Sequence, residues 1–141
     1  NGKESRKKIM TDLNDLKFAP THEWARREGN RVIVGISDDA QRNLSDVIHV
    51  EMPEPDEQHH YEAGEEIGVI ESLKISVDFH APVSGTITSI NAELLSNPEL
   101  INEDPFGAGW LVEMRPDDPD DVDRLMDVDE YEGSLPEEDE E

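Results

Sequence analysis

Apolar residues alternate or run together on both sides of one lysine, Lys74, in the stretch between Gly64 and Gly85. They are Ile67, Val69 and Ile70 before the lysine, then Ile75, Val77 and Phe79 after it. Such a pattern predicts two β-strands. Gly64 lies ten residues before Lys74 and Gly85 lies eleven residues after it. A hairpin folded at the lysine therefore brings both glycines to its far end, where we expect them to shape it, and leaves Lys74 at the tip.

The same reasoning predicts further short elements along the chain. Residues 25–28 and 31–36 flank a Gly-Asn pair that is typical of a hairpin turn. Ser37 is a candidate N-cap for a short helix that ends at Leu44. The remaining expectations are strands at 47–52, 86–90 and 111–114, a loop at 53–62, helical turns at 92–95 and after Pro98, a helix at 120–126, and a last helical turn that includes Tyr131 and Leu135. Strands dominate this prediction, and helices are short.

Composition favours a small sheet protein with a thin core. The 141 residues suit one domain, and apolar residues supply only 34% of them, which disfavours a large α/β enzyme. The sequence has no apolar run of the roughly 18 residues that a membrane span needs, and no secretory signal is visible. Cysteine is absent, which excludes disulfides and cysteine chemistry. We expect a soluble intracellular protein.

The chain is strongly acidic, with a formal net charge of −24. Such a surface repels phosphate backbones and anionic lipids, which argues against nucleic-acid and membrane binding and favours partners with basic patches. Two other interpretations stay open: the charge only keeps the protein soluble, or it reflects growth in high salt. Lysine is scarce, and Lys74 is the only one after Lys17.

The two ends differ in character from the middle. Residues 1–9 are polar and basic, and Met10 resembles a natural start. We therefore expect residues 1–9 to be an extraneous or disordered leader, with a targeting presequence as the alternative. One domain is expected at residues 10–135, and an acidic disordered tail at residues 136–141.

Several common chemistries find no support in the sequence. It contains no GxSxG, Walker-type, HExxH or dinucleotide-binding motif, and no base is marked for Ser84, so a hydrolase is disfavoured. The adjacent His59 and His60 invite a metal interpretation, but neighbours on a strand point to opposite faces, and a solvated loop is preferred. The acidic run at residues 117–123 lacks the glycine and glutamate of a calcium loop. We expect no metal site.

Lys74 is the remaining candidate. The simplest interpretation is that Lys74 is an ordinary exposed lysine in a turn. However, it stands alone in a long acidic stretch, at the centre of two glycine-bounded strand patterns, directly after Glu71-Ser72-Leu73. A protruding primary amine is what a carrier protein needs, because a modifying enzyme must reach it and the attached arm must move between sites. A purely structural acidic module would leave this lysine unexplained.

Longer motifs give a specific family resemblance. They are Thr21-His22-Glu23-Trp24, Val34-Gly35-Ile36-Ser37, Glu71-Ser72-Leu73-Lys74, Ala81-Pro82-Val83-Ser84-Gly85, Asn97-Pro98-Glu99-Leu100-Ile101-Asn102 and Asp104-Pro105-Phe106-Gly107-Ala108-Gly109-Trp110-Leu111. With these motifs in family order, residues 16–135 resemble the H proteins of the glycine cleavage system, which are lipoyl carriers. The resemblance implies a mainly β barrel-sandwich hybrid of two small antiparallel sheets with short helices, C-terminal ones included. Residues 10–135 would then be a single lipoyl-carrier domain.

The resemblance also implies a non-catalytic, monomeric carrier with lipoate attached covalently to Lys74. The arm would carry an aminomethyl unit from the pyridoxal-phosphate-dependent glycine decarboxylase to the tetrahydrofolate-dependent aminomethyltransferase, and its dithiol to dihydrolipoamide dehydrogenase. Lipoyl-transferring enzymes would be further partners, with Glu71 helping them to recognise the site. His22 and Glu23 would contact the arm, and Trp24 would belong to that surface or to the core. The location would be the cytoplasm of a prokaryote or the mitochondrial matrix of a eukaryote.

Two features of the sequence depart from the family pattern. Leu73 and Ile75 are bulkier than the valine and alanine usual beside the lysine, and residues 53–64 are longer and more polar than expected.

Two rival functions accompany this hypothesis. The first is an H-like relay protein that donates lipoate to other enzymes. The second is a biotinyl carrier, which is disfavoured because methionines normally flank its lysine.

Overall fold

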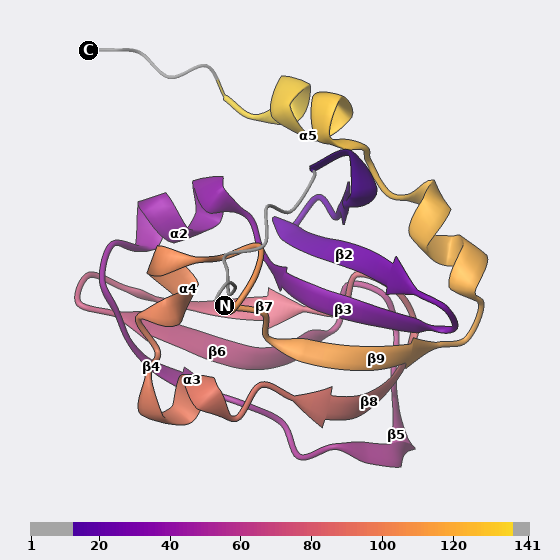
Figure 1. Cartoon of the computed structure of the whole chain (residues 1–141), viewed down its shortest axis with the longest axis horizontal. Coiled ribbons are helices and arrows are strands. Elements are labelled where there is room, and N and C mark those ends of the chain that lie inside the picture. The colour runs from indigo at the N-terminus through magenta and orange to yellow at the C-terminus, as the bar shows by residue number, and fades with distance from the viewer. Residues whose placement is uncertain (1–12, 137–141) are drawn as a thin grey trace, which may run out of the picture.

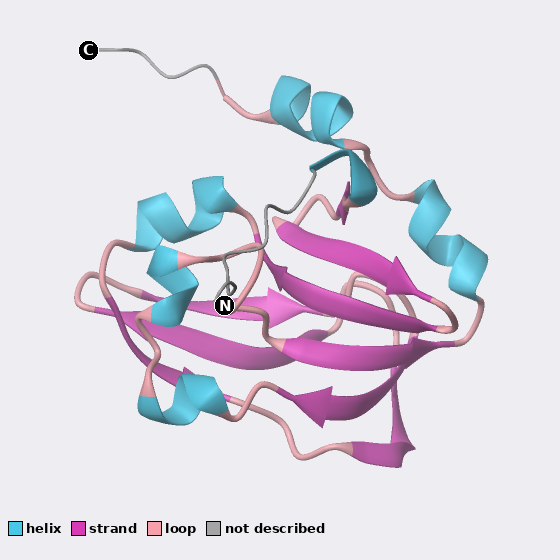
Figure 2. Cartoon of the chain, viewed as in Figure 1, coloured by secondary structure: helices cyan, strands magenta, loops and turns pink. Residues whose placement is uncertain are grey.

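The computed structural model describes residues 13–136, and within them two antiparallel β-sheets enclose a core (Figure 1). Figure 2 shows the short helices around the outside of these sheets. The mainly β class predicted from the sequence is confirmed. Residues 1–9 and the acidic tail after residue 136 lie outside the described residues. In the described part of the chain, no helix has the length and apolar content needed to cross a membrane.

Within residues 13–136, the larger sheet has six strands in the order β1-β2-β3-β9-β8-β5, and the smaller sheet has three in the order β4-β6-β7. The strands are β1 (Lys17–Phe18), β2 (Glu23–Glu28), β3 (Arg31–Ile36), β4 (Val47–Glu51), β5 (Asp56–Tyr61), β6 (Glu66–Ser72), β7 (Ser76–His80), β8 (Gly85–Ile90) and β9 (Val112–Pro116). The α-helices are α2 (Asp38–Leu44), α3 (Glu93–Ser96), α4 (Leu100–Glu103) and α5 (Val128–Ser134), and the 3₁₀ helices are η1 (Leu13–Asp15) and η2 (Pro119–Arg124).

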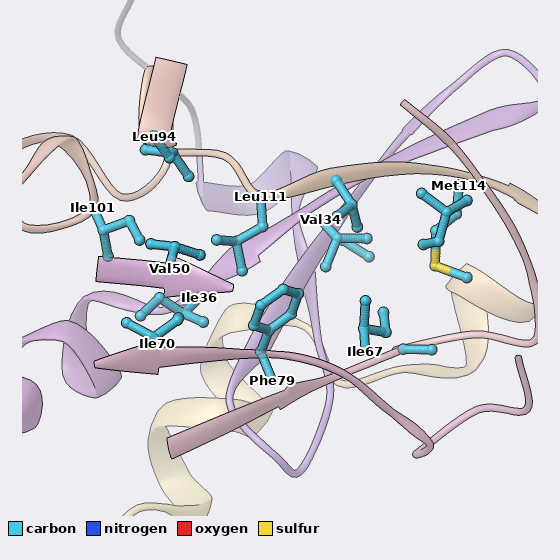
Figure 3. Packing of buried hydrophobic residues seen from close by; sticks show 14 of the residues in the cluster. Val34, Ile36, Val50, Ile67, Ile70, Phe79, Leu94, Ile101, Leu111 and Met114 are labelled. Atoms are coloured by element: carbon cyan, nitrogen blue, oxygen red, sulfur yellow. The ribbon is translucent and has the colours of Figure 1, made fainter. Parts of the chain in front are cut away.

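The main core lies between the two sheets (Figure 3). Along β3, Val32, Val34 and Ile36 are buried at every second position, which is the period of a strand with one inward face. Ile70 of β6 and Phe79 of β7 are fully buried in the same cluster. Burying one such side chain contributes about 1.5–3 kcal/mol. The hairpin that carries the lysine is therefore held to the molecule by its own apolar face.

A second apolar cluster joins the C-terminal helix α5 to the beginning of the described chain. Its buried members are Leu16, Phe18, Trp24 and Tyr131. Trp24 is fully buried, and its indole N–H donates a 2.9 Å hydrogen bond to the carbonyl of Pro105. Of the two places expected for Trp24, the core is the correct one.

The turn chemistry at the start of α2 agrees with the sequence. The Ser37 hydroxyl accepts a 3.1 Å hydrogen bond from the Ala40 N–H, which makes Ser37 the N-cap, and α2 ends at Leu44 as expected. The hairpin predicted from the Gly-Asn pair is also present, because β2 pairs with β3 through a turn in which Gly29 has a φ of +64°.

The loop expected at residues 53–62 is wrong for most of its length. Strand β5 lies there, at the edge of the six-stranded sheet, and pairs Asp56 with Ile87 and Tyr61 with Gly85 across an irregular register. Only Tyr61 among its residues is even partly buried. A strand held by backbone pairing at an exposed edge has no apolar alternation, so the sequence pattern could not reveal it.

The helix expected at residues 120–126 is instead the 3₁₀ helix η2. The Leu125 N–H bonds three residues back, to the carbonyl of Val122 at 3.1 Å. Met126 then leaves the helix, because its backbone exchanges two hydrogen bonds with Phe18 of β1, at 2.7 and 3.0 Å. Pairing with β1 therefore ends the helical segment early.

Candidate functional site

Lys74 lies at the tip of the β6–β7 hairpin, which projects at one end of the molecule (Figure 1). The two strands pair up to the turn, with Ile70 opposite Val77 and Glu71 opposite Ser76. The Lys74 side chain is exposed and makes no hydrogen bond or ion pair with any residue in the range 13–136. Its amine is therefore open to a modifying enzyme.

Ser72 fixes the turn that presents the lysine. This residue is only 8% exposed, and its Oγ accepts hydrogen bonds from the N–H groups of Lys74 at 3.1 Å and Ile75 at 3.0 Å. The same hydroxyl donates to the Ile75 carbonyl at 3.1 Å. The Leu73 N–H donates to the carbonyl of Asp46 at 3.0 Å, just before β4. The backbone at Lys74 is thus held on both sides while its side chain extends into solvent.

A groove of about 180 Å³ opens beside the hairpin, between β7, α2 and the turn that precedes β2. Its apolar lining consists of Ile36, Ala40, Leu44, Ile75 and Val77. Its polar lining consists of Thr21, His22, Glu23, Asn43 and Asp78. Because Ile75 follows Lys74 directly, the groove begins next to the lysine. An arm on that lysine would meet apolar walls together with two carboxyl groups.

Glu23 is the buried acid of this groove, with 1% of its surface exposed. The Thr21 hydroxyl donates to one carboxylate oxygen, and the His80 backbone N–H donates to the other at 2.7 Å. The imidazole Nδ1 of His80 lies 3.0 Å from that second oxygen. Burial raises the pKa of Glu23, and the hydrogen bonds from Thr21 and His80 oppose the rise. A cation entering the groove would further favour the ionised carboxylate.

His22 connects the groove to the C-terminal helix. Its φ is +82°, in the left-handed region, and its N–H donates to the Ala19 carbonyl at 2.9 Å. Its Nδ1 lies 2.7 Å from the hydroxyl of Tyr131 on α5. The structure therefore brings His22 and Glu23, the residues expected to contact an arm, into one groove beside the hairpin tip.

The other three residues singled out by sequence lie outside the groove. Glu71 is half-buried on β6, close to the turn. Gly64 has a φ of +89°, and its N–H donates to the Ala81 carbonyl at 2.7 Å, at the far end of the hairpin. Gly85 lies in β8 rather than in the hairpin, and a Cβ there would lie 2.2 Å from the carbonyl oxygen of Arg115. Close packing of β8 on β9 thus requires a glycine at this position.

The adjacent histidines have other partners. The rings of His59 and Tyr61 have centroids 4.5 Å apart, and His60 Nε2 lies 2.7 Å from the carboxylate of Asp117. The hydrogen bond to Asp117 raises the pKa of His60. Among residues 13–136, no group of three or more His, Asp or Glu side chains is arranged to hold a metal ion.

Sequence reasoning missed three residues of this site: Ser72, Thr21 and Asp78. A serine at a turn is a recognised signal for hydroxyl-to-backbone hydrogen bonds, so the role of Ser72 could have been found. Thr21 and Asp78 carry no such signal, because the groove joins segments more than 50 residues apart in the chain. Their proximity follows only from the packing of β7 beside the start of β2.

Two small antiparallel sheets with an exposed lysine on a tight hairpin turn define a carrier domain, the class of protein that presents a covalently attached cofactor to other enzymes. The apolar groove beginning beside the lysine fits this class, because a swinging arm needs a place to rest between partners. Comparison with known proteins then identifies the family.

A family model described as Glycine cleavage H-protein matches residues 16–138. The chain is 47% identical over 126 residues to a glycine cleavage system H protein of Acinetobacter baumannii, covering 89% of this chain and 100% of the relative. It is 44% identical to that of Legionella pneumophila, covering 89% and 99%. The crystal structure of a glycine cleavage system H protein from Mycobacterium marinum superposes with a TM-score of 0.76 at 35% identity, over 85% and 95% of the two chains. The chain therefore belongs to the glycine cleavage H-protein family, the non-catalytic lipoyl carriers of the glycine cleavage system.

Proposed function

We propose that lipoate is joined by an amide bond to Nζ of Lys74 and that the groove beside the hairpin holds the far end of this arm. The observation that supports the proposal is the adjacency of an exposed lysine to a groove containing a buried carboxyl group, with Ile75 shared by turn and groove. When attached, the lipoyl group would supply two redox sulfurs, one of which would carry the aminomethyl cargo, in a chain that has no cysteine.

The residues of the groove fit both ends of such an arm. Ile36, Leu44 and Val77 offer apolar walls to the hydrocarbon chain and the sulfur-containing end. Glu23 and Asp78 offer carboxyl groups to a primary ammonium. A cation beside Glu23 favours the ionised carboxylate and so offsets the desolvation that raises its pKa. The groove would therefore hold a basic cargo more strongly than an unloaded arm.

The hairpin tip would be the part that other enzymes recognise. Leu73 is 71% exposed and Ile75 is 47% exposed on the two sides of the lysine, and Glu71 lies at the end of β6. We infer that lipoyl-transferring enzymes would recognise the acidic Glu71 together with the exposed apolar side chains of Leu73 and Ile75.

Three enzymes would share the loaded arm: glycine decarboxylase, aminomethyltransferase and dihydrolipoamide dehydrogenase. A net charge of −24 favours docking on basic faces of these partners and accelerates encounter at low ionic strength. Tethering raises the local concentration of the cargo at each active site without any chemistry by the carrier itself. A monomer suits this role, because every partner must reach the same hairpin tip.

We place the protein in a bacterial cytoplasm. The relatives described above come from Acinetobacter and Legionella, and the matching crystal structure comes from Mycobacterium. All are bacteria, which favours the cytoplasm over the mitochondrial matrix.

Exchange of the glycine carboxyl carbon with labelled bicarbonate tests this function. Lipoylated protein is mixed with glycine decarboxylase, and incorporation of label into glycine is measured. Wild-type protein should support exchange, Lys74→Arg should abolish it, and Lys17→Arg should retain it as the matched control. Exchange supported by Lys74→Arg would contradict the proposal. Absence of exchange with fully lipoylated wild-type protein would also contradict it, and would favour a relay of lipoate to other enzymes.

A further inference from the structure

Tyr131, on the C-terminal helix α5, lies outside the groove but hydrogen-bonds to His22, which lines it, and to Ser37, which caps the helix α2 that supplies part of its lining. It is 3% exposed, and its ring stacks on Phe18 with centroids 4.6 Å apart and 10° between the ring planes. Its hydroxyl lies 2.7 Å from Nδ1 of His22 and 2.8 Å from Oγ of Ser37. One phenolic oxygen therefore joins the turn before β2 to the start of α2.

These hydrogen bonds connect two walls of the groove. His22 and Glu23 belong to one wall, and Ser37 is the N-cap of α2, which supplies Ala40 and Leu44 to the other. The Ser37 N–H also donates to the His22 carbonyl at 2.9 Å. The separation of the two walls is therefore set where His22, Ser37 and the Tyr131 hydroxyl meet.

The hydroxyl groups of Ser37 and Tyr131 can form a continuous chain of hydrogen bonds that ends at His22. Ser37 Oγ accepts the Ala40 N–H at 3.1 Å, which leaves its own proton for the Tyr131 oxygen. Tyr131 can then donate its proton to Nδ1 of His22. A tyrosine hydroxyl is protonated at neutral pH, and burial raises the pKa of Tyr131 above its ordinary value of 10.0. Each of these polar atoms then has a partner away from water.

The backbone at His22 makes the wall dependent on these bonds. A left-handed φ of +82° is unfavourable for a residue with a Cβ, and it persists only where the surroundings hold it. Here the surroundings are hydrogen bonds to Ala19, Ser37 and Tyr131. Loss of the phenolic hydroxyl would loosen the turn that leads into Glu23.

From this geometry we infer that Tyr131 is a positioning residue for the arm groove, acting through His22 and Ser37. Its ring fixes α5 on Phe18, and its hydroxyl sets the spacing between the turn before β2 and α2. The inference rests on the proposed role of the groove in holding the lipoyl arm. It makes α5 part of the carrier site, although the groove lining in the described structure includes no residue of that helix.

The first test uses protein without lipoate. Tyr131→Phe keeps the stacked ring and removes only the hydroxyl, whereas Tyr61→Phe makes the same change on β5 and is the matched control. Amide hydrogen exchange measured by NMR should accelerate roughly two- to tenfold at Ser37 and Ala40 in Tyr131→Phe, and should not change in Tyr61→Phe. Unchanged exchange at both amides in folded Tyr131→Phe would overturn the inference.

The second test uses lipoylated protein loaded with the aminomethyl cargo and separated from its enzymes. Water slowly cleaves the carbon–sulfur bond of an S-aminomethyl group, giving the thiol, formaldehyde and ammonia, so the release of formaldehyde reports how well the groove shields the cargo. Release should be roughly two- to tenfold faster from Tyr131→Phe than from wild type, and equal to wild type in Tyr61→Phe.

A further variant covers the case in which Tyr131→Phe does not fold. His22→Phe keeps an aromatic ring and the strained left-handed backbone but removes Nδ1, the atom that the Tyr131 hydroxyl contacts, so it should show the same faster release. Unchanged release would overturn the inference. Wild-type protein that loses its cargo as fast as free dihydrolipoamide does would overturn the proposed groove function as well. Wild-type protection that Tyr131→Phe fully retains would overturn the inference alone.

Discussion

The backbone N–H of His80 donates a 2.7 Å hydrogen bond to the buried carboxylate of Glu23. This bond joins β7, the second strand of the lysine hairpin, to the first residue of β2 in the larger sheet. The acid of the groove is therefore positioned by the same strand that continues from the lysine turn. The hairpin and the carboxylate therefore cannot shift independently. This fixes the position of the arm's attachment point relative to the groove that would bind the arm.

Glu23→Gln should weaken retention of a basic cargo. The amide oxygen can still accept the His80 N–H, but the negative charge that a primary ammonium would meet is lost. A hydrogen bond to a charged group contributes about 1.5–3 kcal/mol, so formaldehyde release from loaded protein should accelerate roughly ten- to hundredfold. Glu28→Gln, which removes an exposed acid paired with Arg26, is the control. Equal release rates from the two variants would show that Glu23 does not hold the cargo.

The raised pKa of Glu23 has a consequence for stability against pH. Because burial favours the neutral carboxyl, the folded protein keeps this proton over a range where the unfolded chain loses it. The stability contributed is fully present below the ordinary value of 4.5 and is lost as pH rises through the folded pKa. The unfolding free energy of wild type minus that of Glu23→Gln, from urea titrations, should fall as the pH is raised above 4.5. A constant difference over that range would contradict the pKa assignment.

Ser72→Ala should destabilise the fold and slow lipoylation. The buried hydroxyl accepts the N–H groups of Lys74 and Ile75, and its removal leaves both without that partner. The expected cost in urea unfolding is about 1–3 kcal/mol, with slower modification because the lysine turn is less fixed. Ser76→Ala, at an exposed position two residues after the lysine, should change neither. A Ser72→Ala protein that is lipoylated at the wild-type rate would show that the enzyme does not depend on a fixed turn.

Two glycines should respond in opposite ways to substitution by alanine. Gly85→Ala places a Cβ 2.2 Å from the Arg115 carbonyl oxygen, so β8 and β9 must separate, at a cost of about 1–3 kcal/mol or more. Gly133→Ala meets no atom within 4 Å on helix α5 and should stabilise the protein by about 0.5–1 kcal/mol. Thermal unfolding of both variants checks the pair. Equal shifts of the unfolding temperature in the two variants would mean that β8 and β9 are packed less closely than described.

The lysine hairpin was predictable because its strands bury one face, and burial leaves an apolar pattern in the sequence. Strand β5 was not, since nearly all its side chains are exposed and backbone pairing leaves no such pattern. The N-cap at Ser37 was predictable because capping depends on neighbouring residues alone. The contacts of Glu23 with His80, and of His22 with Tyr131, join distant segments, and no local pattern specifies them.

Intact mass of the protein after growth with lipoate, followed by peptide mapping, tests the central claim most directly. We expect one lipoyl-sized increment, located on Lys74 and absent from Lys74→Arg. A lipoyl increment on any other residue, or biotin on Lys74, would contradict the assignment.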